Sequence, residues 1–358
     1  MNRSWSSLRA RLVSTSTSTS HTSSRVRLSS VVFFASTGVL VSSYLLWPSK
    51  YRGSPTFTHK PMSPNYFIPA TVSDISQTGP DLAVLTLTLP HDAHSTTDDA
   101  SSLEPIWSIF VKDDDIQVER PYTPLHGVDE NGNIKLWVKR YQRGEVGRWL
   151  HSKRTGDTVE IRGPLKTFPF HQGKWDEIVM ISGGTGFSPF HQLLFRQLLP
   201  LQDKPVDDDT RFTLLHASRS PAELPPSPIL QPLIDFAGAH PDHLRVRLFV
   251  DSDAQARVPE SIARSLHVGR IDKCSIAHAL GLSDGRCSWT SWINSFWTKG
   301  RSRGGDEDIR KKNILVLVCG PEPMVAAIAG PYGKNYSQGK VGGVLAELGF
   351  MAGQVWKL

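Results

Sequence analysis

The most informative hydrophobic pattern in the chain is a short apolar run that ends in a cluster of glycines. Residues 178–181 read Ile-Val-Met-Ile, which is typical of a strand buried on both faces of a sheet. Three glycines lie between positions 183 and 186, and residues 190–199 then place apolar side chains at helical spacing. The pattern predicts a buried strand, a glycine turn and a helix, in that order.

Apolar runs of the same kind recur through the second half of the chain. We expect strands at residues 177–182, 212–217, 244–250 and 314–319, with helical stretches between them. Alternation of strand and helix predicts a parallel, doubly wound α/β domain, which we place at residues 173–358.

The first half lacks helical periodicity and has short β-like segments separated by turn residues. We expect strands at residues 67–72, 82–89, 106–112, 134–138 and 158–161, and a loop over 90–105. This pattern predicts a small antiparallel β-barrel at residues 66–172.

The N-terminal region has a different composition. Residues 1–27 are rich in Arg, Ser and Thr, and the first acidic residue is Asp74. This favours a mitochondrial targeting segment, with a disordered low-complexity tail as the alternative. Residues 28–49 carry no charge and are long enough for a transmembrane helix, although a secretory signal is a rival interpretation. Residues 50–65 contain prolines and are interpreted as a linker.

Charge and cysteine content exclude two classes of function. The net charge of the chain is +6, but residues 1–60 hold eight Lys and Arg residues and no Asp or Glu. The rest of the chain has 32 basic and 34 acidic residues, a net charge of −2. The basic balance therefore comes from the N-terminus and does not indicate a nucleic-acid partner. The three cysteines show no C-x-x-C spacing, so no metal site is expected.

Three stretches carry residue types suited to binding phosphates. Arg120-Pro121-Tyr122-Thr123 combines a guanidinium, an aromatic ring and a hydroxyl. Gly144-Glu145-Val146-Gly147 can open a helix and offer its amides, and so can Gly183-Gly184-Thr185-Gly186. Each stretch alone also has a structural interpretation, as an edge strand or as a tight turn.

Together these stretches resemble the ferredoxin-reductase-type flavoproteins and, within them, the cytochrome b5 reductases. The resemblance covers roughly residues 66–358 and includes a fourth motif, Cys319-Gly320-Pro321-Glu322-Pro323-Met324. A closer similarity, to fungal mitochondrial flavoproteins that support haem attachment to cytochrome c, rests on Arg140-Tyr141-Gln142-Arg143 and on a glycine-rich tail from Gly330 to Gly343.

The resemblance implies that FAD binds between the barrel and the α/β domain, with NADH or NADPH as electron donor. It implies catalytic positions for Thr123, near the flavin N5, and for Cys319, beside the nicotinamide C4. The remaining cofactor-binding positions that it implies are Arg120, Pro121, Tyr122, Val138, Tyr141, Gly144, Val146, Gly147, Gly183, Gly184, Thr185, Gly186, Pro189, Gly320, Pro321 and Met324. Arg219, at the end of an expected strand, is a further candidate.

The sequence departs from the family pattern at several positions. Gly147 stands where the family usually has Ser or Thr, and Lys166 where it usually has Gly. The chain ends in Trp356-Lys357-Leu358 where the b5 reductases end in Phe, so Trp356 is the candidate aromatic near the flavin.

Two further segments keep open interpretations. Arg219 either meets a ribose 2′-phosphate, which would favour NADPH, or faces solvent. Residues 281–312 contain three tryptophans followed by a basic, glycine-rich stretch, and are either a surface insertion or a contact with a membrane or partner. We assign no chemistry to Gly269-Arg270-Ile271.

The resulting hypothesis is an NAD(P)H-dependent FAD oxidoreductase that passes electrons to haem or a haem protein of the cytochrome c or cytochrome b5 type. We expect it at the mitochondrial inner membrane, held by residues 28–49, with the catalytic domain facing the intermembrane space and supporting haem attachment to cytochrome c. The alternatives are an NADH-cytochrome b5 reductase and a flavin-binding assembly factor with little turnover.

Overall fold

Six strands of the first half pair into one antiparallel sheet. The computed structural model describes residues 55–94, 104–113, 117–171, 173–198, 210–252, 258–282 and 312–358. The sheet has the order β4-β3-β6-β1-β2-β5. Its strands are β1 (Ile68–Gly79), β2 (Leu82–Thr88), β3 (Ile106–Lys112), β4 (Glu119–Tyr122), β5 (Asn133–Lys139) and β6 (Thr158–Phe168). All five predicted strands are found, and β1 and β6 extend well beyond their predicted ends.

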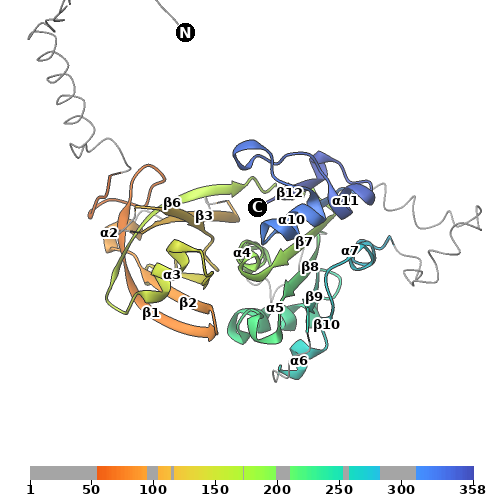
Figure 1. Cartoon of the computed structure of the whole chain (residues 1–358), viewed down its shortest axis with the longest axis horizontal. Helices are drawn as coiled ribbons and strands as arrows, with labels where there is room; N and C mark the ends of the chain where they lie inside the picture. The colour runs from red at the N-terminus through yellow and green to blue at the C-terminus, as the bar shows by residue number, and fades with distance from the viewer. Residues whose placement is uncertain are drawn as a thin grey trace, which may run out of the picture. The chain divides into compact units, whose positions relative to one another are not determined.

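The sheet curls around an apolar core, so the predicted barrel is confirmed as a barrel-like sheet (Figure 1). Among the pairings of the described residues, β4 and β5 remain the two edges of the sheet. Helix α3 (Glu145–Ser152) packs Val146, Trp149 and Leu150 into the same core, and α2 (His91–His94) is a single short turn. Alternation places Ile134, Leu136 and Val138 of β5 on the core side.

The second half forms a six-stranded sheet that is parallel throughout, as predicted. Its order is β10-β9-β8-β7-β11-β12. The strands are β7 (Glu177–Gly183), β8 (Arg211–Ser218), β9 (Leu244–Val250), β10 (Leu266–Val268), β11 (Ile314–Cys319) and β12 (Val355–Lys357). The four long predicted strands are confirmed, whereas the three-residue edge strands β10 and β12 were not predicted, because runs so short carry little periodicity.

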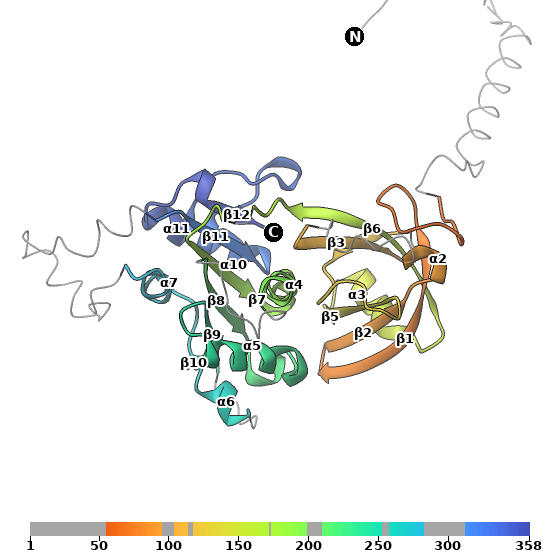
Figure 2. The ribbon, with the colours of Figure 1, turned by 180° about the vertical axis from the view of Figure 1, so that it is seen from behind.

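Helices cover both faces of this sheet (Figures 1 and 2). One apolar cluster joins the sheet to α4 (Ser188–Gln197) and α5 (Ser227–Ala239), and a second joins it to α7 (Lys273–Ala279), α10 (Glu322–Ala329) and α11 (Gly343–Glu347). The remaining helical turns are η2 (Gly184–Phe187), η4 (Pro221–Glu223), α6 (Glu260–Ala263), η5 (Lys334–Tyr336) and η6 (Ala352–Gln354).

The barrel packs against the α4 face of the α/β domain. Trp137 of β5 meets Phe187 edge to face, with ring centroids 6.2 Å apart. The backbone N–H of Trp107 donates to Gln192 Oε1 at 2.8 Å, and Lys139 forms an ion pair with Glu223. Residues 54–358 accordingly cluster as one compact unit.

Several predictions concern residues outside those described. They are the targeting segment 1–27, the transmembrane helix 28–49, the first part of the linker 50–65, and nearly all of the insertion 281–312. Among the described residues, no helix is both long and apolar enough to cross a bilayer.

Candidate functional site

A cavity of about 410 Å³ lies where the barrel meets the α/β domain. Its barrel side is built by the end of β4, by β5 and by the start of α3, and its other side by the loops after β7 and β11. The lining residues are Arg120, Pro121, Tyr122, Thr123, Trp137, Lys139, Tyr141, Gly144, Glu145, Val146, Gly147, Gly183, Thr185, Gly186, Ser188, Pro189, Cys319, Gly320 and Pro321.

Sheet topology explains why the cavity forms at this place. From β7 the chain runs outward through β8, β9 and β10, and then returns to the other side of β7 as β11. The loops after β7 and β11 therefore diverge, which opens a crevice at the carboxyl ends of the strands. Gly183 and Cys319 end these two strands, so motifs far apart in the sequence meet here.

Glycine is required where the two loops touch. A Cβ on Gly186 would lie 2.5 Å from the Cys319 carbonyl oxygen, and one on Gly183 would collide with Met324. Gly320 has a φ of +159°, and a Cβ there would lie 3.0 Å from the Gly183 nitrogen. The close approach of the loops therefore depends on these glycines, and it keeps the backbone exposed to the cavity.

The barrel contributes charge and hydroxyl groups. Arg120 is exposed and anchors its guanidinium by donating from Nη1 to the Glu119 carbonyl oxygen at 2.9 Å. Helix α3 begins after Gly144 without a side-chain cap, which leaves the N–H groups of its first turn available to a ligand. A Cβ on Gly147 would lie 3.0 Å from the Lys139 carbonyl oxygen, so the close packing of α3 on β5 accounts for glycine where the family has Ser or Thr.

Two titratable groups of the cavity stay protonated at neutral pH. Burial raises the pKa of the Cys319 thiol to about 12. Burial also raises the pKa of Tyr122 to about 12, although the neighbouring Arg120 opposes this shift. Both side chains therefore offer an S–H or O–H group and no negative charge.

The residues present fit FAD, the cofactor that the resemblance implies. Ser188 is 3% exposed, lines the cavity, and has an Oγ without a hydrogen-bond partner in the described structure. A buried hydroxyl of this kind is costly unless a ligand completes its hydrogen bonding. Arg120 and the first turn of α3 supply cationic and N–H groups for a diphosphate, and Trp137 supplies an apolar wall.

A second cavity, of about 360 Å³, adjoins the first. The two share Lys139, Tyr141, Gly183 and Pro321. The second cavity is otherwise lined by the α/β domain: Gly184, Ala217, Ser218, Arg219, Glu223, Asp251, Arg270, Ile271, Pro323, Met324, Ala327 and Ile328. The two cavities therefore lie next to each other.

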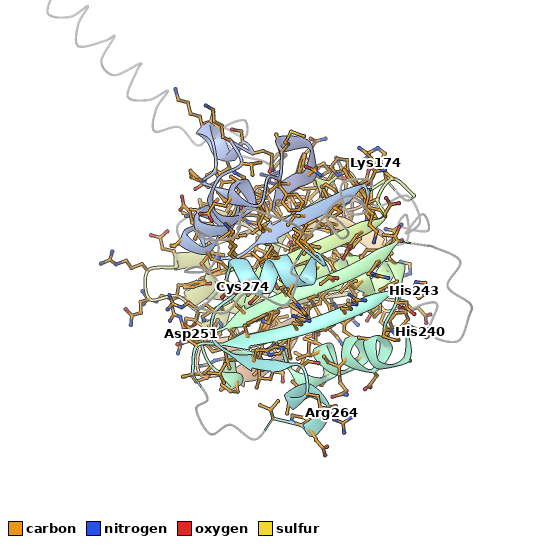
Figure 3. The ribbon with its side chains drawn as sticks, turned by 90° about the vertical axis from the view of Figure 1, so that its right-hand side faces the viewer. Lys174, His240, His243, Asp251, Arg264 and Cys274 are labelled. Atoms are coloured by element: carbon orange, nitrogen blue, oxygen red, sulfur yellow. The ribbon has the colours of Figure 1, made fainter. Side chains whose placement is uncertain are left out.

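The second cavity has a charged end. Figure 3 shows Asp251 at the carboxyl end of β9, the end opposite His240 and His243. The Asp251 carboxylate accepts from Arg270 Nε at 3.1 Å, and Arg219 lines the same cavity. One carboxylate and two guanidinium groups therefore stand where the strands β8 and β9 end.

Most of the predicted site residues come together in these cavities. The first holds both predicted catalytic residues and most of the predicted cofactor contacts, while Gly184, Arg219 and Met324 line the second. Val138 lines neither, because it faces the barrel core and is fully buried. Their binding roles remain predictions, but the position of Val138 is corrected: its neighbours Trp137 and Lys139 point to the site.

Two of the departures from the family pattern lie away from the cavities. Trp356 lines neither cavity and packs edge to face on Phe168, with ring centroids 5.4 Å apart. A role of Trp356 near the flavin therefore remains a prediction. Lys166 is exposed and pairs with Glu104 at 3.5 Å.

Sequence reasoning missed several residues that line the cavities. Period-2 alternation along β5 could have identified Trp137 and Lys139. The rule that ligands bind beyond the carboxyl ends of strands could have identified Asp251, which directly follows β9. No local signal marks Glu223, which reaches the second cavity only through the packing of the chain, and Arg270 was noted in the sequence without an assigned role.

Comparison with known proteins agrees with this geometry. Residues 69–170 match the oxidoreductase FAD-binding domain family. An uncharacterized FAD-binding protein of Schizosaccharomyces pombe is 29% identical over 300 residues, which cover 83% of this chain and 86% of the relative. The NADH-cytochrome b5 reductase 2 of Meyerozyma guilliermondii is 30% identical over 240 residues, which cover 67% of each chain.

A solved structure shares the fold. The cytochrome b5 reductase domain of Ulva prolifera nitrate reductase superposes with a TM-score of 0.56 at 21% identity, covering 84% of this chain and all of that domain. The chain belongs to the cytochrome b5 reductase-like FAD flavoproteins and is an oxidoreductase that uses FAD with NADH or NADPH as electron donor.

Proposed function

We propose that the protein takes a hydride from NADH and delivers electrons one at a time to the haem iron of an acceptor. The observation that carries the proposal is the wall shared by the two cavities, formed by Lys139, Tyr141, Gly183 and Pro321. A nicotinamide nucleotide in one cavity and a flavin in the other would meet at this wall, as hydride transfer requires. The names of several relatives, NADH-cytochrome b5 reductase 2, agree with a haem-protein acceptor.

The chain's own residues bind and orient the reactants in this proposal. FAD, when bound, supplies the conversion of a two-electron donation into single-electron transfers. Arg120 and the first turn of α3 would neutralise its diphosphate, and Thr123, which directly follows β4, offers a hydroxyl group to the cavity. Cys319 stays protonated, so no thiolate repels electron density developing beside it.

We assign NADH as the donor because of the carboxylate at the end of the second cavity. The Asp251 carboxylate can accept hydrogen bonds from ribose hydroxyl groups, whereas an ionised ribose 2′-phosphate has no hydrogen to donate to it. Arg270 is engaged by Asp251, which leaves Arg219 as the remaining guanidinium of this cavity. We therefore propose that Arg219 binds the diphosphate of the nucleotide and does not select NADPH over NADH.

We further propose that the protein acts at the mitochondrial inner membrane, with residues 54–358 in the intermembrane space, and supports haem attachment to cytochrome c. Three sequence features support this: the Arg- and Ser-rich segment 1–27, the uncharged segment 28–49, and the glycine-rich tail shared with the fungal haem-attachment flavoproteins.

Anaerobic stopped-flow absorbance tests the proposed reaction. Purified, FAD-loaded protein is mixed with NADH or NADPH, and ferric haem, cytochrome c or cytochrome b5 is added in a second mix. We expect rapid bleaching of the flavin band by NADH, slower bleaching by NADPH, and reduction of at least one haem acceptor. Bleaching without haem reduction would refute the acceptor, and a flavin that neither nucleotide bleaches would favour the low-turnover assembly factor.

The proposed location has its own test. Mitochondria are isolated from cells that carry a C-terminally tagged chain, and the tag is probed with protease before and after rupture of the outer membrane. Protection that is lost on rupture, together with resistance to carbonate extraction, is the expected result. A tag that is protected until the inner membrane is dissolved would place the catalytic domain in the matrix and refute the orientation.

A further inference from the structure

Three polar side chains form a buried chain of hydrogen bonds at the ends of β7 and β8. Ser182 and His216 lie opposite each other in the parallel register of the two strands. Ser182 Oγ lies 2.8 Å from His216 Nδ1, and His216 Nε2 lies 3.0 Å from Ser218 Oγ. Ser218 Oγ in turn donates to the Glu223 carbonyl oxygen at 3.0 Å.

The last bond fixes the direction of all the others. The Ser218 hydroxyl hydrogen is used on the Glu223 carbonyl, so Ser218 Oγ must accept a hydrogen from His216 Nε2. Nδ1 of the neutral ring is then an acceptor, and Ser182 Oγ donates to it. Complete burial lowers the pKa of His216 to about 3, so this arrangement does not change at physiological pH.

These polar groups occupy positions where the strands otherwise present apolar side chains. On the same face of β7 and β8 lie Met180 and Leu214, both in the apolar cluster under α4. Phe187 meets the His216 ring edge to face, with centroids 5.2 Å apart. An aliphatic or aromatic residue would fill the position of His216 without the free-energy cost of burying a polar ring. We therefore infer that the hydrogen bonds of His216 serve a purpose beyond packing.

The chain of bonds leads to the wall of the second cavity. Ser218 and Glu223 both line that cavity, and Gly183, which directly follows Ser182, lines both cavities. The Glu223 carboxylate also pairs with Lys139 of the barrel, another residue shared by the two cavities. A displacement of Ser218 would therefore move the turn at 221–223 and with it the position of Lys139.

We propose that His216 is a positioning residue for the nicotinamide nucleotide: through Ser218 it fixes the wall formed by the end of β8 and the 221–223 turn. The inference rests on the proposed function, because it takes the second cavity as the nucleotide site. His216 itself is fully buried and lines neither cavity, so it acts only through the residues it holds.

The test replaces His216→Phe, which keeps an aromatic ring against Phe187 and removes both hydrogen bonds. NAD⁺, which does not reduce the flavin, is titrated into FAD-loaded protein, and NADH kinetics are measured in parallel. We expect the NAD⁺ dissociation constant and the KM for NADH to rise about tenfold, equivalent to about 1.4 kcal/mol. We expect kcat at saturating NADH and the FAD content to stay within about twofold, since the flavin cavity keeps its residues.

A second variant separates positioning from stability. Ser182→Ala combined with His216→Phe leaves no buried hydroxyl without a partner at this point, so thermal stability should recover. Nucleotide affinity should stay low, because Ser218 still lacks its donor. If affinity recovers together with stability, His216 has a merely structural role and the inference is overturned. Ser218→Ala should weaken NAD⁺ binding to a similar extent, and normal binding by that variant would also overturn it.

A matched control comes from the opposite end of the same strand. Thr210 is buried just before β8, and its Oγ1 donates to the Trp175 carbonyl oxygen at 2.9 Å. Thr210→Val removes a comparable bond away from both cavities and should lower stability without changing NAD⁺ affinity. Wild-type protein that neither binds NAD⁺ nor is reduced by NADH refutes the proposed function and this inference together. Binding that is equal in the wild type and His216→Phe refutes the inference alone.

Discussion

Acidification provides a sharp test of the structure, because His216 is held neutral inside the α/β domain. Its pKa falls from an ordinary value of 6.5 to about 3 on folding, and the cause is burial. Between these values the unfolded chain binds a proton that the native protein does not bind. Stability due to this residue is therefore fully present above pH 6.5 and is lost as the pH falls below it.

The size of the effect follows from the two pKa values. Lowering the pH from 7 to 5 protonates His216 in the unfolded chain only, which costs about 2 kcal/mol of unfolding free energy at about 1.4 kcal/mol per pH unit. At an unfolding entropy of about 2 cal/mol/K per residue, this loss lowers the midpoint of thermal unfolding of a protein of this size by roughly 3 °C. The half-buried His126 and the buried His191 have lowered pKa values too, mainly because of desolvation, and add to the total loss.

The assay compares urea unfolding of the wild type and His216→Phe at pH 7 and pH 5, with the same FAD concentration throughout. The variant is less stable at pH 7 because it has lost two hydrogen bonds, but its stability should fall by about 2 kcal/mol less between the two pH values. The contributions of the other histidines cancel in this difference. Equal losses in the two proteins would show that His216 already titrates near its ordinary pKa and would refute the argument.

Other substitutions test the two cavities. Arg120→Ala should weaken FAD retention about tenfold or more on gel filtration, since a charge-assisted contact to the diphosphate is lost, and full retention would show that the diphosphate lies elsewhere. Ser188→Ala should raise the melting temperature of FAD-free protein, because it removes an unsatisfied buried hydroxyl that costs about 1 kcal/mol, but it should weaken FAD binding. A variant that binds FAD as tightly as the wild type would refute the role of Ser188 as a ligand group. Asp251→Ala should lower the KM for NADPH relative to that for NADH, and an unchanged ratio would remove this residue from donor selection. Gly186→Ala should displace the Cys319 carbonyl group and lower the free energy of unfolding by roughly 1–3 kcal/mol, as measured by thermal unfolding. Unchanged stability would show that the loops after β7 and β11 are not in contact.

The sequence predicted the architecture well because the long strands are apolar or alternate clearly. The run at 178–181 and the run at 314–319 are nearly continuous apolar stretches, which fixed β7 and β11 to within one residue. The edge strands β10 and β12 were missed because three residues carry too little pattern. Within the site, Val138 was named from the family resemblance, whereas its neighbours Trp137 and Lys139 line the cavity. Strand register decides which face a side chain takes, and a shift of one residue reverses it.

Other parts of the site depend on tertiary structure alone. Asp251 and Arg270 meet across 19 positions of sequence, and Glu223 reaches Lys139 across 84. Ser188 follows the glycine motif, but nothing in the sequence distinguishes a hydroxyl that caps a helix from one that is buried without a partner. Motif matching therefore located the glycine loops, whereas the charged groups that close the second cavity required the fold.

The protonated state of Cys319 also bears on how the protein tolerates oxidants. Only the thiolate reacts readily with peroxide or with alkylating reagents, and a pKa near 12 leaves about one thiol in 10⁵ ionised at pH 7. A sulfur atom that lies beside a redox centre is thereby kept out of sulfenic acid chemistry. Iodoacetamide should modify Cys319 far more slowly than an exposed thiol, and the protein should remain active through peroxide exposure that inactivates enzymes with low-pKa cysteines.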